Sequence, residues 1–187
     1  TIVGCNTRKY HGLMVAPIDQ SDRTYVLLSS LDETIMQHDQ SFNLALHRFE
    51  GTYEPRGHKY ITDFEYTPVP TITYRVGGAI LKKELLWVHN RTQLMIRYTL
   101  VDAHSETTLR LRPLLAFRDK HALSKANMEA DGRAYPIPYG VKCRLYDGFP
   151  WLHMQLNKEE HDFIAAPDWY YNFEYRKELA RGYEGHE

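Results

Sequence analysis

The stretch TITYRVGGAILKKELLWVHNRTQLMIRYTL, residues 71–100, has the pattern of three β-strands in succession. Gly77 and Gly78 separate the first strand-like run from the next, and two adjacent glycines are typical of a tight hairpin turn because both can adopt positive φ. Residues 89–92 supply the polar group expected at a second turn. Beyond this turn, every second position carries an apolar or aromatic residue: Leu94, Ile96, Tyr98 and Leu100. This period of two predicts a sheet with one buried face.

Similar runs lie on both sides of this stretch. Residues 25–31 (YVLLSSL) are apolar apart from two serines, residues 42–49 alternate loosely, and residues 108–112 alternate again. Strands separated by turns at such spacing form sandwiches or barrels. We therefore predict an all-β fold, a large antiparallel two-sheet β-sandwich with few short helices.

Helical patterns are short. Residues 123–130 have room for a turn or two, and residues 175–181 (YRKELAR) indicate a short helix that stops at Gly182. The sequence shows no repeats and no low-complexity tract. Residues 1–187 are therefore expected to form a single domain, with residues 160–187 as an extension leaving the sandwich.

Composition and charge exclude several partners. The 187 residues carry a formal charge of −1, and the basic residues form no stripe, so no nucleic acid is expected. No run approaches the roughly 20 apolar residues that a membrane span needs, so no membrane is expected. Cys143 lies on an apolar strand face, far in the chain from Cys5, which favours a free buried thiol over a disulfide and indicates the cytoplasm.

The sequence lacks the motifs of several enzyme classes. It contains no P-loop, no G-x-G-x-x-G and no H-E-x-x-H, so we expect no cofactor and no metal site. No G-x-S-x-G elbow occurs, although a dispersed Ser-His-Asp triad stays open. Glycoside hydrolysis needs two carboxylates, but Asp32-Glu33, Asp119 and Glu159-Glu160 are predicted to be solvated acids in turns. No catalytic residue is assigned.

Polar and aromatic residues gather in three places. The N-terminal cluster is residues 6–12 (NTRKYHG), the strand cluster is residues 111–121 (LRPLLAFRDKH), and the C-terminal cluster is residues 169–175 (WYYNFEY) with Glu178, Arg181 and Gly182. An Arg-Asp pair beside a His at a strand end can bind hydroxyl groups through directional hydrogen bonds. It can equally lock a loop through a bidentate ion pair.

These segments resemble one family in the same order along the chain. NTRKYHGL (6–13) and RPLLAFRDKH (112–121) are the most specific pieces, and WYYNFEYRKELARG (169–182) is moderately specific. Together with the strands at 23–34 and 71–100, they are similar to the N-terminal domain of the bacterial and archaeal type of glycogen debranching enzyme, the amylo-α-1,6-glucosidase group. The resemblance covers almost the whole chain.

The resemblance implies a sandwich of the supersandwich type that precedes an (α/α)6 catalytic barrel. Family members usually begin with a Gly-rich segment before the N-T-R motif, so the resemblance implies a domain truncated at both ends, with residues 160–187 leading towards a missing barrel. The carboxylates that hydrolyse α-1,6 branch points are then expected outside this chain, and the fragment alone is expected to be inactive.

In this interpretation the clusters face the barrel and complete its cleft for glycogen or another α-glucan. Arg8, Arg118 and Asp119 would bind sugar hydroxyls, and aromatic rings would stack on a pyranose face. The full set of candidate substrate-binding residues is Arg8, Tyr10, His11, Arg118, Asp119, His121, Trp169 and Tyr170. Two alternatives stay open: a purely structural docking domain without sugar contact, and a stand-alone carbohydrate-binding module.

Overall fold

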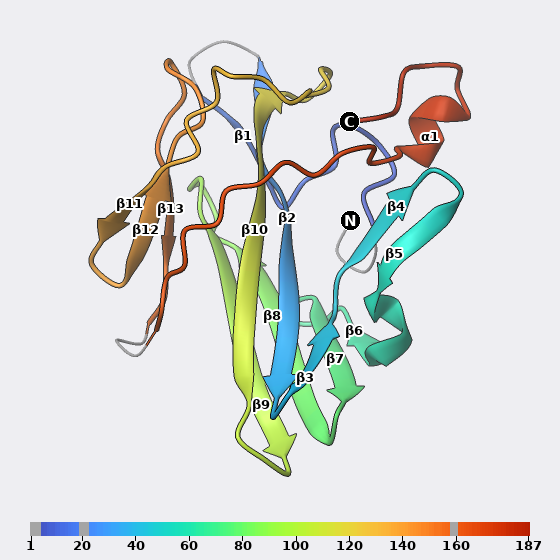
Figure 1. Ribbon diagram of the computed structural model, residues 1–187, viewed down its shortest axis with the longest axis vertical. Helices are drawn as coiled ribbons and strands as arrows, with labels where there is room; N and C mark the ends of the chain where they lie inside the picture. The colour runs from blue at the N-terminus through green and yellow to red at the C-terminus, as the bar shows by residue number, and fades with distance from the viewer. Residues whose placement is uncertain (1–4, 19–22, 158–160) are drawn as a thin grey trace.

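The computed structural model describes residues 5–18, 23–157 and 161–187, and strands make up almost all of its regular structure (Figure 1). Two four-stranded antiparallel sheets form the body, and a three-stranded and a two-stranded sheet flank them. The predicted all-β class and the antiparallel sandwich are confirmed.

Residues 71–100 contribute three strands to the sheet that lies behind the others in Figure 1. Its strands, in order, are β6 (Ile61–Glu65), β7 (Thr71–Val76), β8 (Ala79–Trp87) and β9 (Leu94–Ala103). Val76 pairs with Ala79 across the predicted hairpin, and Gly77 and Gly78 have φ of 58° and 79°. Positive φ at both central residues matches the right-handed twist of the flanking strands, which explains why glycines occupy the turn.

The second large sheet consists of β1 (Met14–Pro17), β2 (Thr24–Gln37) and β10 (Thr108–Asp119), with β3 (Gln40–Asn43) paired to the end of β2. β2 runs well past the predicted boundary at Leu31. The prediction that Asp32 and Glu33 are solvated turn acids is therefore wrong: they lie within β2 and are only 5% and 3% exposed.

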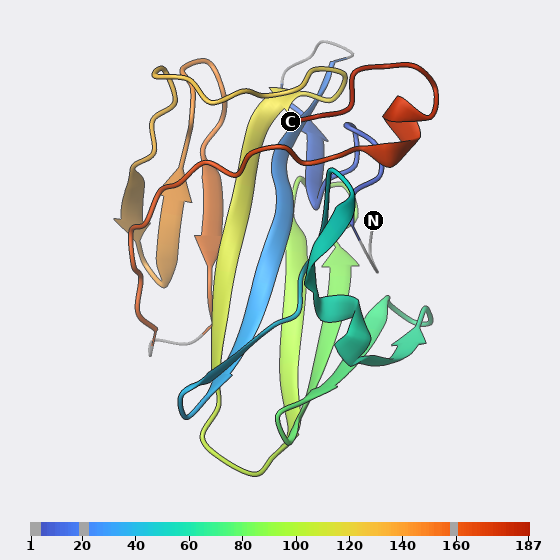
Figure 2. The ribbon, with the colours of Figure 1, turned by 45° about the vertical axis from the view of Figure 1, so that its right-hand side comes forward.

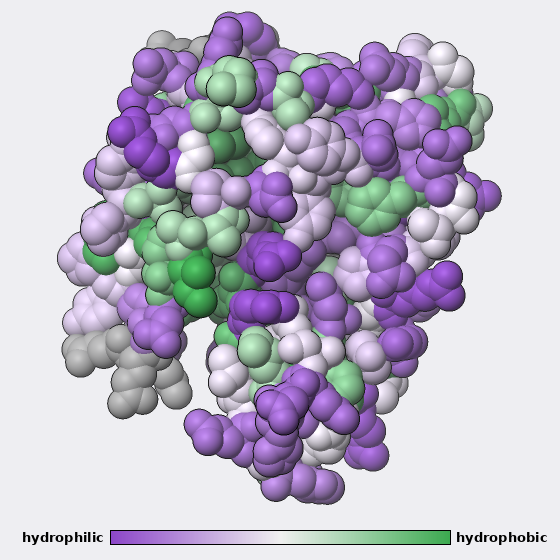
Figure 3. Space-filling view, in the orientation of Figure 1, coloured by the Kyte–Doolittle hydropathy of each residue, from purple (hydrophilic) through white to green (hydrophobic). Residues whose placement is uncertain are grey.

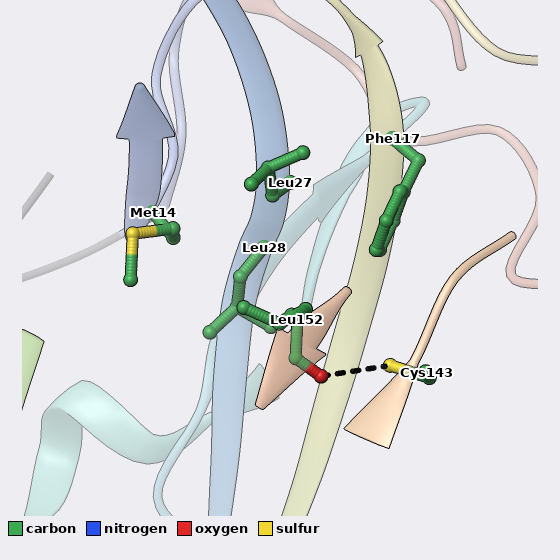
Figure 4. Close-up of a cluster of buried hydrophobic side chains, with 6 residues drawn as sticks. All are labelled: Met14, Leu27, Leu28, Phe117, Cys143 and Leu152. Atoms are coloured by element: carbon green, nitrogen blue, oxygen red, sulfur yellow. Dashed lines mark hydrogen bonds between the residues drawn. The ribbon is translucent and has the colours of Figure 1, made fainter. Parts of the chain in front are cut away.

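Two hydrophobic clusters share β2. One fills the space between the large sheets: Ile35, Leu44, Ile72, Tyr74, Val76 and Leu81. The other joins β1, β2 and β10 to the three-stranded sheet, and Figure 4 shows its members: Met14, Leu27, Leu28, Phe117, Cys143 and Leu152. Cys143 is buried and free, as predicted, with Sγ directed at the carbonyl oxygen of Leu152.

The three-stranded sheet consists of β11 (Ala134–Ile137), β12 (Gly140–Cys143) and β13 (Leu152–Gln155). The two-stranded sheet consists of β4 (Leu46–Phe49) and β5 (Thr52–Arg56), followed by the 3-10 helix η1 (Gly57–Tyr60).

Helix is limited to η1 and α1 (Arg176–Leu179) within the described ranges. The predicted helix near residues 175–181 is confirmed in a shorter form, and the prediction for residues 123–130 is wrong. Asn127 explains the second outcome, because its side-chain oxygen accepts hydrogen bonds from the backbone N–H of Glu129 and Ala130 and so competes with helix formation.

The C-terminal segment crosses the front of β10 and β2 before it reaches α1 (Figures 1 and 2). The space-filling view of this face is mainly hydrophilic at its centre and right, and its largest hydrophobic patch lies on the left, on the side of β11–β13 (Figure 3). None of the helices in the described ranges is long and apolar enough to cross a membrane.

Candidate functional site

The three polar-aromatic clusters meet in space. The backbone N–H of Lys177 donates to the carbonyl oxygen of Thr7 at 2.9 Å, which joins α1 to the N-terminal cluster. The rings of Tyr10 and His121 lie 6.5 Å apart between centroids, which joins the N-terminal cluster to the strand cluster. Segments that are distant in the sequence therefore form one continuous region.

Arg118 lies at the buried centre of this region and is only 6% exposed. Its Nη2 donates to Glu187 Oε2 at 2.8 Å and to the hydroxyl of Tyr175 at 3.2 Å, and its Nε also donates to the Glu187 carboxylate. The Tyr175 hydroxyl donates to Glu187, and the backbone N–H of Ser124 donates to Oε1 at 2.9 Å. We call Arg118, Tyr175, Glu187 and Ser124 the Glu187 clasp, which ties the C-terminal segment to β10.

The clasp has a stable protonation pattern. Burial raises the pKa of Tyr175, and the neighbouring Glu187 carboxylate raises it further. The phenol therefore stays protonated at neutral pH and continues to donate its proton to the carboxylate. A charged guanidinium, a carboxylate and a phenol thus satisfy one another inside the protein.

Arg8 is also paired internally. Its Nη1 lies 3.7 Å from Oε1 of Glu178, a residue only 2% exposed, and its guanidinium lies 5.6 Å from the ring centre of Tyr10. The ion pair holds the N-terminal cluster against α1. The Arg8 side chain is thus half-buried, with its guanidinium beside the buried Glu178.

Asp119 shapes a turn. Its Oδ1 accepts a hydrogen bond of 2.8 Å from the backbone N–H of His121. This bond fixes the loop after β10 and places the exposed His121 ring beside Tyr10, which is 37% exposed. The two charged side chains of the strand cluster that were predicted to bind a ligand, Arg118 and Asp119, therefore make contacts that stabilise the chain around them.

His11 completes a group of three rings, which we call the ring patch: Tyr10, His11 and His121. Tyr10 and His11 pack edge to face at 5.4 Å. The His11 Nδ1 accepts a hydrogen bond from the backbone N–H of Thr7 at 3.3 Å, so this nitrogen carries no proton. Burial lowers the pKa of His11, and the charges of Arg8 and Lys177 lower it further. The ring patch is therefore neutral at His11 and open to solvent at Tyr10 and His121.

Trp169 and Tyr170 lie on the C-terminal segment, where it crosses β10. Tyr170 stacks parallel to Phe173 at 6.0 Å, and its hydroxyl accepts a hydrogen bond of 2.5 Å from Arg112. Phe173 continues the stack against Phe49 at 5.2 Å. Both Trp169 and Tyr170 are half-buried, so each offers only part of its surface to a ligand.

The sequence patterns did not reveal the buried acids as paired groups. Asp32 contacts His47 Nε2 through both carboxylate oxygens, at 2.9 and 2.8 Å, and Glu33 lies 2.6 Å from Lys83. Successive residues of a strand point to opposite faces, so the two acids reach different partners. The sequence did contain one indication of a buried ion pair: on β8, Lys83 occupies the apolar row between Leu81 and Leu85.

All four buried acids of the described ranges face a basic side chain. The four pairs are Asp32 with His47, Glu33 with Lys83, Glu174 with Arg48, and Glu178 with Arg8. Such pairing offsets part of the cost of burying each charge, although Arg8 Nη1 and Glu178 Oε1 make no hydrogen bond at their separation of 3.7 Å. Glu159 and Glu160, also considered as acids, lie outside the described residues.

Metal-ligand geometry gives no further candidate in the part of the chain that the structure describes, where no three His, Cys, Asp or Glu side chains gather as a metal-binding group.

Comparison with known proteins supplies the identity of the domain. No protein with a curated description and no solved structure matches the chain. One family model, described as glycogen debranching enzyme N terminal, matches residues 1–187. Because the match covers the entire sequence, the chain belongs to the family of glycogen debranching enzyme N-terminal domains.

Proposed function

We propose that this chain is a non-catalytic β-sandwich domain of a glycogen debranching enzyme, an enzyme that hydrolyses α-1,6-glucosidic branch points. In this proposal residues 1–187 form one domain, residues 160–187 lead towards an (α/α)6 catalytic domain, and the sandwich packs on that domain. The partners are the catalytic domain and an α-glucan such as glycogen. Membership of the family supports the assignment to the enzyme.

The pairing of the buried acids is the observation that carries the non-catalytic role. A glycoside hydrolase needs one carboxyl group as an acid and a second as a base or nucleophile, about 5–10 Å apart. The four buried acids of the described ranges are instead held by basic side chains. The catalytic carboxylates are therefore assigned to the catalytic domain.

The candidate binding residues divide into two groups by the contacts that they make. Arg8, Arg118 and Asp119 hold the three clusters together. The rings form the second group: Tyr10 and His121 are exposed, and His11, Trp169 and Tyr170 are half-buried. Tyrosine and tryptophan rings suit contact with the apolar face of a pyranose. We therefore assign an accessory α-glucan contact to these rings, and a supporting role to the charged residues.

A purely structural domain is the second candidate. The ion pairs of the half-buried Arg8 and the buried Arg118 favour it, because these groups then stabilise the fold without a ligand. We also propose a cytoplasmic location, which the free thiol of Cys143 supports because a reducing compartment preserves thiols.

Two measurements on the 187-residue chain test the proposal. We expect no glucose release from an α-1,6-branched dextrin, and glucose release would refute the non-catalytic role. In an NMR titration with maltoheptaose, we expect chemical-shift changes around Tyr10 and His121 that the Tyr10→Ala variant removes. Trp87→Ala is a matched control, because Trp87 is an exposed aromatic residue on β8. If the ring patch does not respond while the fold is intact, the structural alternative replaces the sugar contact.

A further inference from the structure

A second candidate binding site lies on the three-stranded sheet. A cleft of about 400 Å³ is lined by residues of β11 and β12 and by the segments around them. Its size falls within the range of small-molecule sites, roughly 300–1,000 Å³. None of its lining residues belongs to the N-terminal, strand or C-terminal cluster, so the cleft is separate from the region proposed above.

Strand alternation places aromatic and basic side chains in the cleft. On β12 Val141 and Cys143 are buried, so Lys142 between them points to the opposite face of the sheet. Lys142 pairs in register with Tyr135 of β11. On the other side of β12, Trp151 precedes the buried Leu152 of β13 and points away from the core.

Trp151 is the aromatic centre of this face. Its ring meets Tyr135 edge to face at 5.3 Å between centroids. Lys142 Nζ lies 4.8 Å from the centre of the indole ring, and Arg144 Cζ lies 4.7 Å from it. These cation–π contacts fix the position of the indole, while the half-buried ring still lines the cleft.

Ion pairs form the walls of the cleft. Arg133 donates two hydrogen bonds to the carboxylate of Asp131, at 2.8 and 2.9 Å, and Arg144 donates to Asp147 at 3.0 Å. The wall that carries Asp131 is attached to the floor, because the backbone N–H of Asp131 donates to the carbonyl oxygen of Leu145 at 2.8 Å. Asp131, with its side chain 30% exposed, is thus the best-anchored polar group of the cleft, whereas the side chains of Arg133 and Asp147 are 75% and 100% exposed.

The charges of the lining residues balance. Three acids and three bases line the cleft: Glu129, Asp131, Asp147, Arg133, Lys142 and Arg144. An anion or a cation gains no net attraction from such a set. A neutral ligand with many hydroxyl groups gains directional hydrogen bonds from both carboxylates and guanidinium groups. Planar polar groups around an aromatic ring thus favour a carbohydrate.

We propose that this cleft binds a segment of a neutral sugar chain, and that the chain is an α-glucan. The choice of α-glucan rests on the proposed function, whereas the choice of a neutral carbohydrate rests on the lining residues alone. The cleft then holds the polymer at a point away from the ring patch, so that one domain contacts the glucan twice.

The test is an NMR titration of the 187-residue chain with maltoheptaose, followed separately at the amides of β11–β13 and at the ring patch. We expect saturable shift changes in β12 and β13. Trp151→Ala should weaken this binding at least tenfold and leave the response of the ring patch intact. Asp131→Asn is the second variant, because it keeps the size and hydrogen-bonding shape of the side chain and removes only its charge, and it should weaken binding severalfold.

The other outcomes separate the two proposals. Maltoheptaose shifts confined to the ring patch would overturn the cleft and leave the proposed function standing. A cleft that responds to inorganic phosphate but not to maltoheptaose would be an anion site and would also overturn the inference. Shifts in β12 and β13 that survive both Trp151→Ala and Asp131→Asn would place the sugar elsewhere.

Discussion

Lys83 on β8 and Glu33 on β2 form an ion pair across the interior between the two large sheets, with Nζ 2.6 Å from Oε1. The hydroxyl of Tyr98 on β9 donates to the same carboxylate oxygen at 2.5 Å. Burial raises the pKa of Tyr98, so its hydroxyl remains a donor at neutral pH. The ion pair and its phenol fix how one sheet lies on the other.

Lys83→Met is predicted to lower the free energy of unfolding by about 3–5 kcal/mol, because it leaves the Glu33 carboxylate buried without its cation. Chemical denaturation followed by circular dichroism measures this. The double variant Glu33→Gln/Lys83→Met should be less destabilised than Lys83→Met alone, since it buries no charge. Equal stability of the two variants would contradict the ion-pair explanation.

Arg97→Ala is the matched control for Lys83→Met. Arg97 also pairs with an acid across β8 and β9, at 2.5 Å from Glu84, but its side chain is 73% exposed. Exposed ion pairs contribute little to stability because water and salt screen them. The free energy of unfolding should therefore change far less than in Lys83→Met.

Arg118→Ala should open the Glu187 clasp. We expect a loss of about 2–3 kcal/mol in the free energy of unfolding, because two hydrogen bonds to the Glu187 carboxylate and one to the Tyr175 hydroxyl disappear. Hydrogen exchange should accelerate at the backbone amides of Phe173 and Glu187, which bond to each other, while β7 and β8 keep their protection. Unchanged exchange at Phe173 would show that the C-terminal segment is held without the clasp.

His11 should make stability depend on pH below neutrality. Its pKa in the folded chain lies below the ordinary value of 6.5, so the unfolded chain takes up a proton first as pH falls. Its contribution to stability is therefore complete above about pH 6.5 and is lost as pH falls towards the lowered pKa. An NMR titration of the ring protons gives this pKa, and His11→Gln should remove this part of the pH dependence. A titration midpoint at or above 6.5 would refute the prediction.

Cys143 should be unreactive in the folded chain. Burial raises the pKa of its thiol to about 11, so almost no thiolate exists at neutral pH. Iodoacetamide labelling, read by peptide mass spectrometry, should modify Cys143 only as denaturant unfolds the chain. Labelling in the absence of denaturant at the rate of a free thiol would contradict its burial.

Asp131 should titrate at an unusually low pH. Hydrogen bonds from the Arg133 side chain and backbone lower its pKa to about 2. Arg133→Gln should raise this pKa towards the ordinary value of 3.8, as measured by NMR of the side-chain carboxyl carbon. A wild-type value near 3.8 would mean that the wall of the cleft is not preorganised.

Local patterns were sufficient for much of the fold. The Gly77-Gly78 hairpin, the alternation of β9 as far as Tyr98 and the inward position of Cys143 follow from turn chemistry and the period of strands, both of which act between near neighbours. Leu100, predicted on the buried face, is 47% exposed. The missing helix at residues 123–130 has a local cause too, in the competing hydrogen bonds of Asn127.

Ion pairs between residues that are distant in the sequence could not be predicted from local patterns. Asp32 and Glu33 resemble turn acids until His47 and Lys83 are seen to neutralise them, and His47 and Lys83 approach only in the folded chain. Arg118 is predicted to meet a ligand, yet its carboxylate partner is Glu187, at the far end of the sequence. The positive φ of 47° at Phe117, where the pairing of β10 with β2 shifts register, is likewise absent from any residue pattern.

The pairing of β2 with β10 also governs the order in which the chain can assemble. Asp32 lies opposite Arg112 in this pairing. β2 therefore cannot pair with β10 until β3–β9 have been synthesised. The hairpins of β6–β9 join close neighbours and can form early, whereas closing the long loop between β2 and β10 costs more chain entropy. During translation, an apolar early strand is thus left without its main partner until the ribosome has passed Asp119.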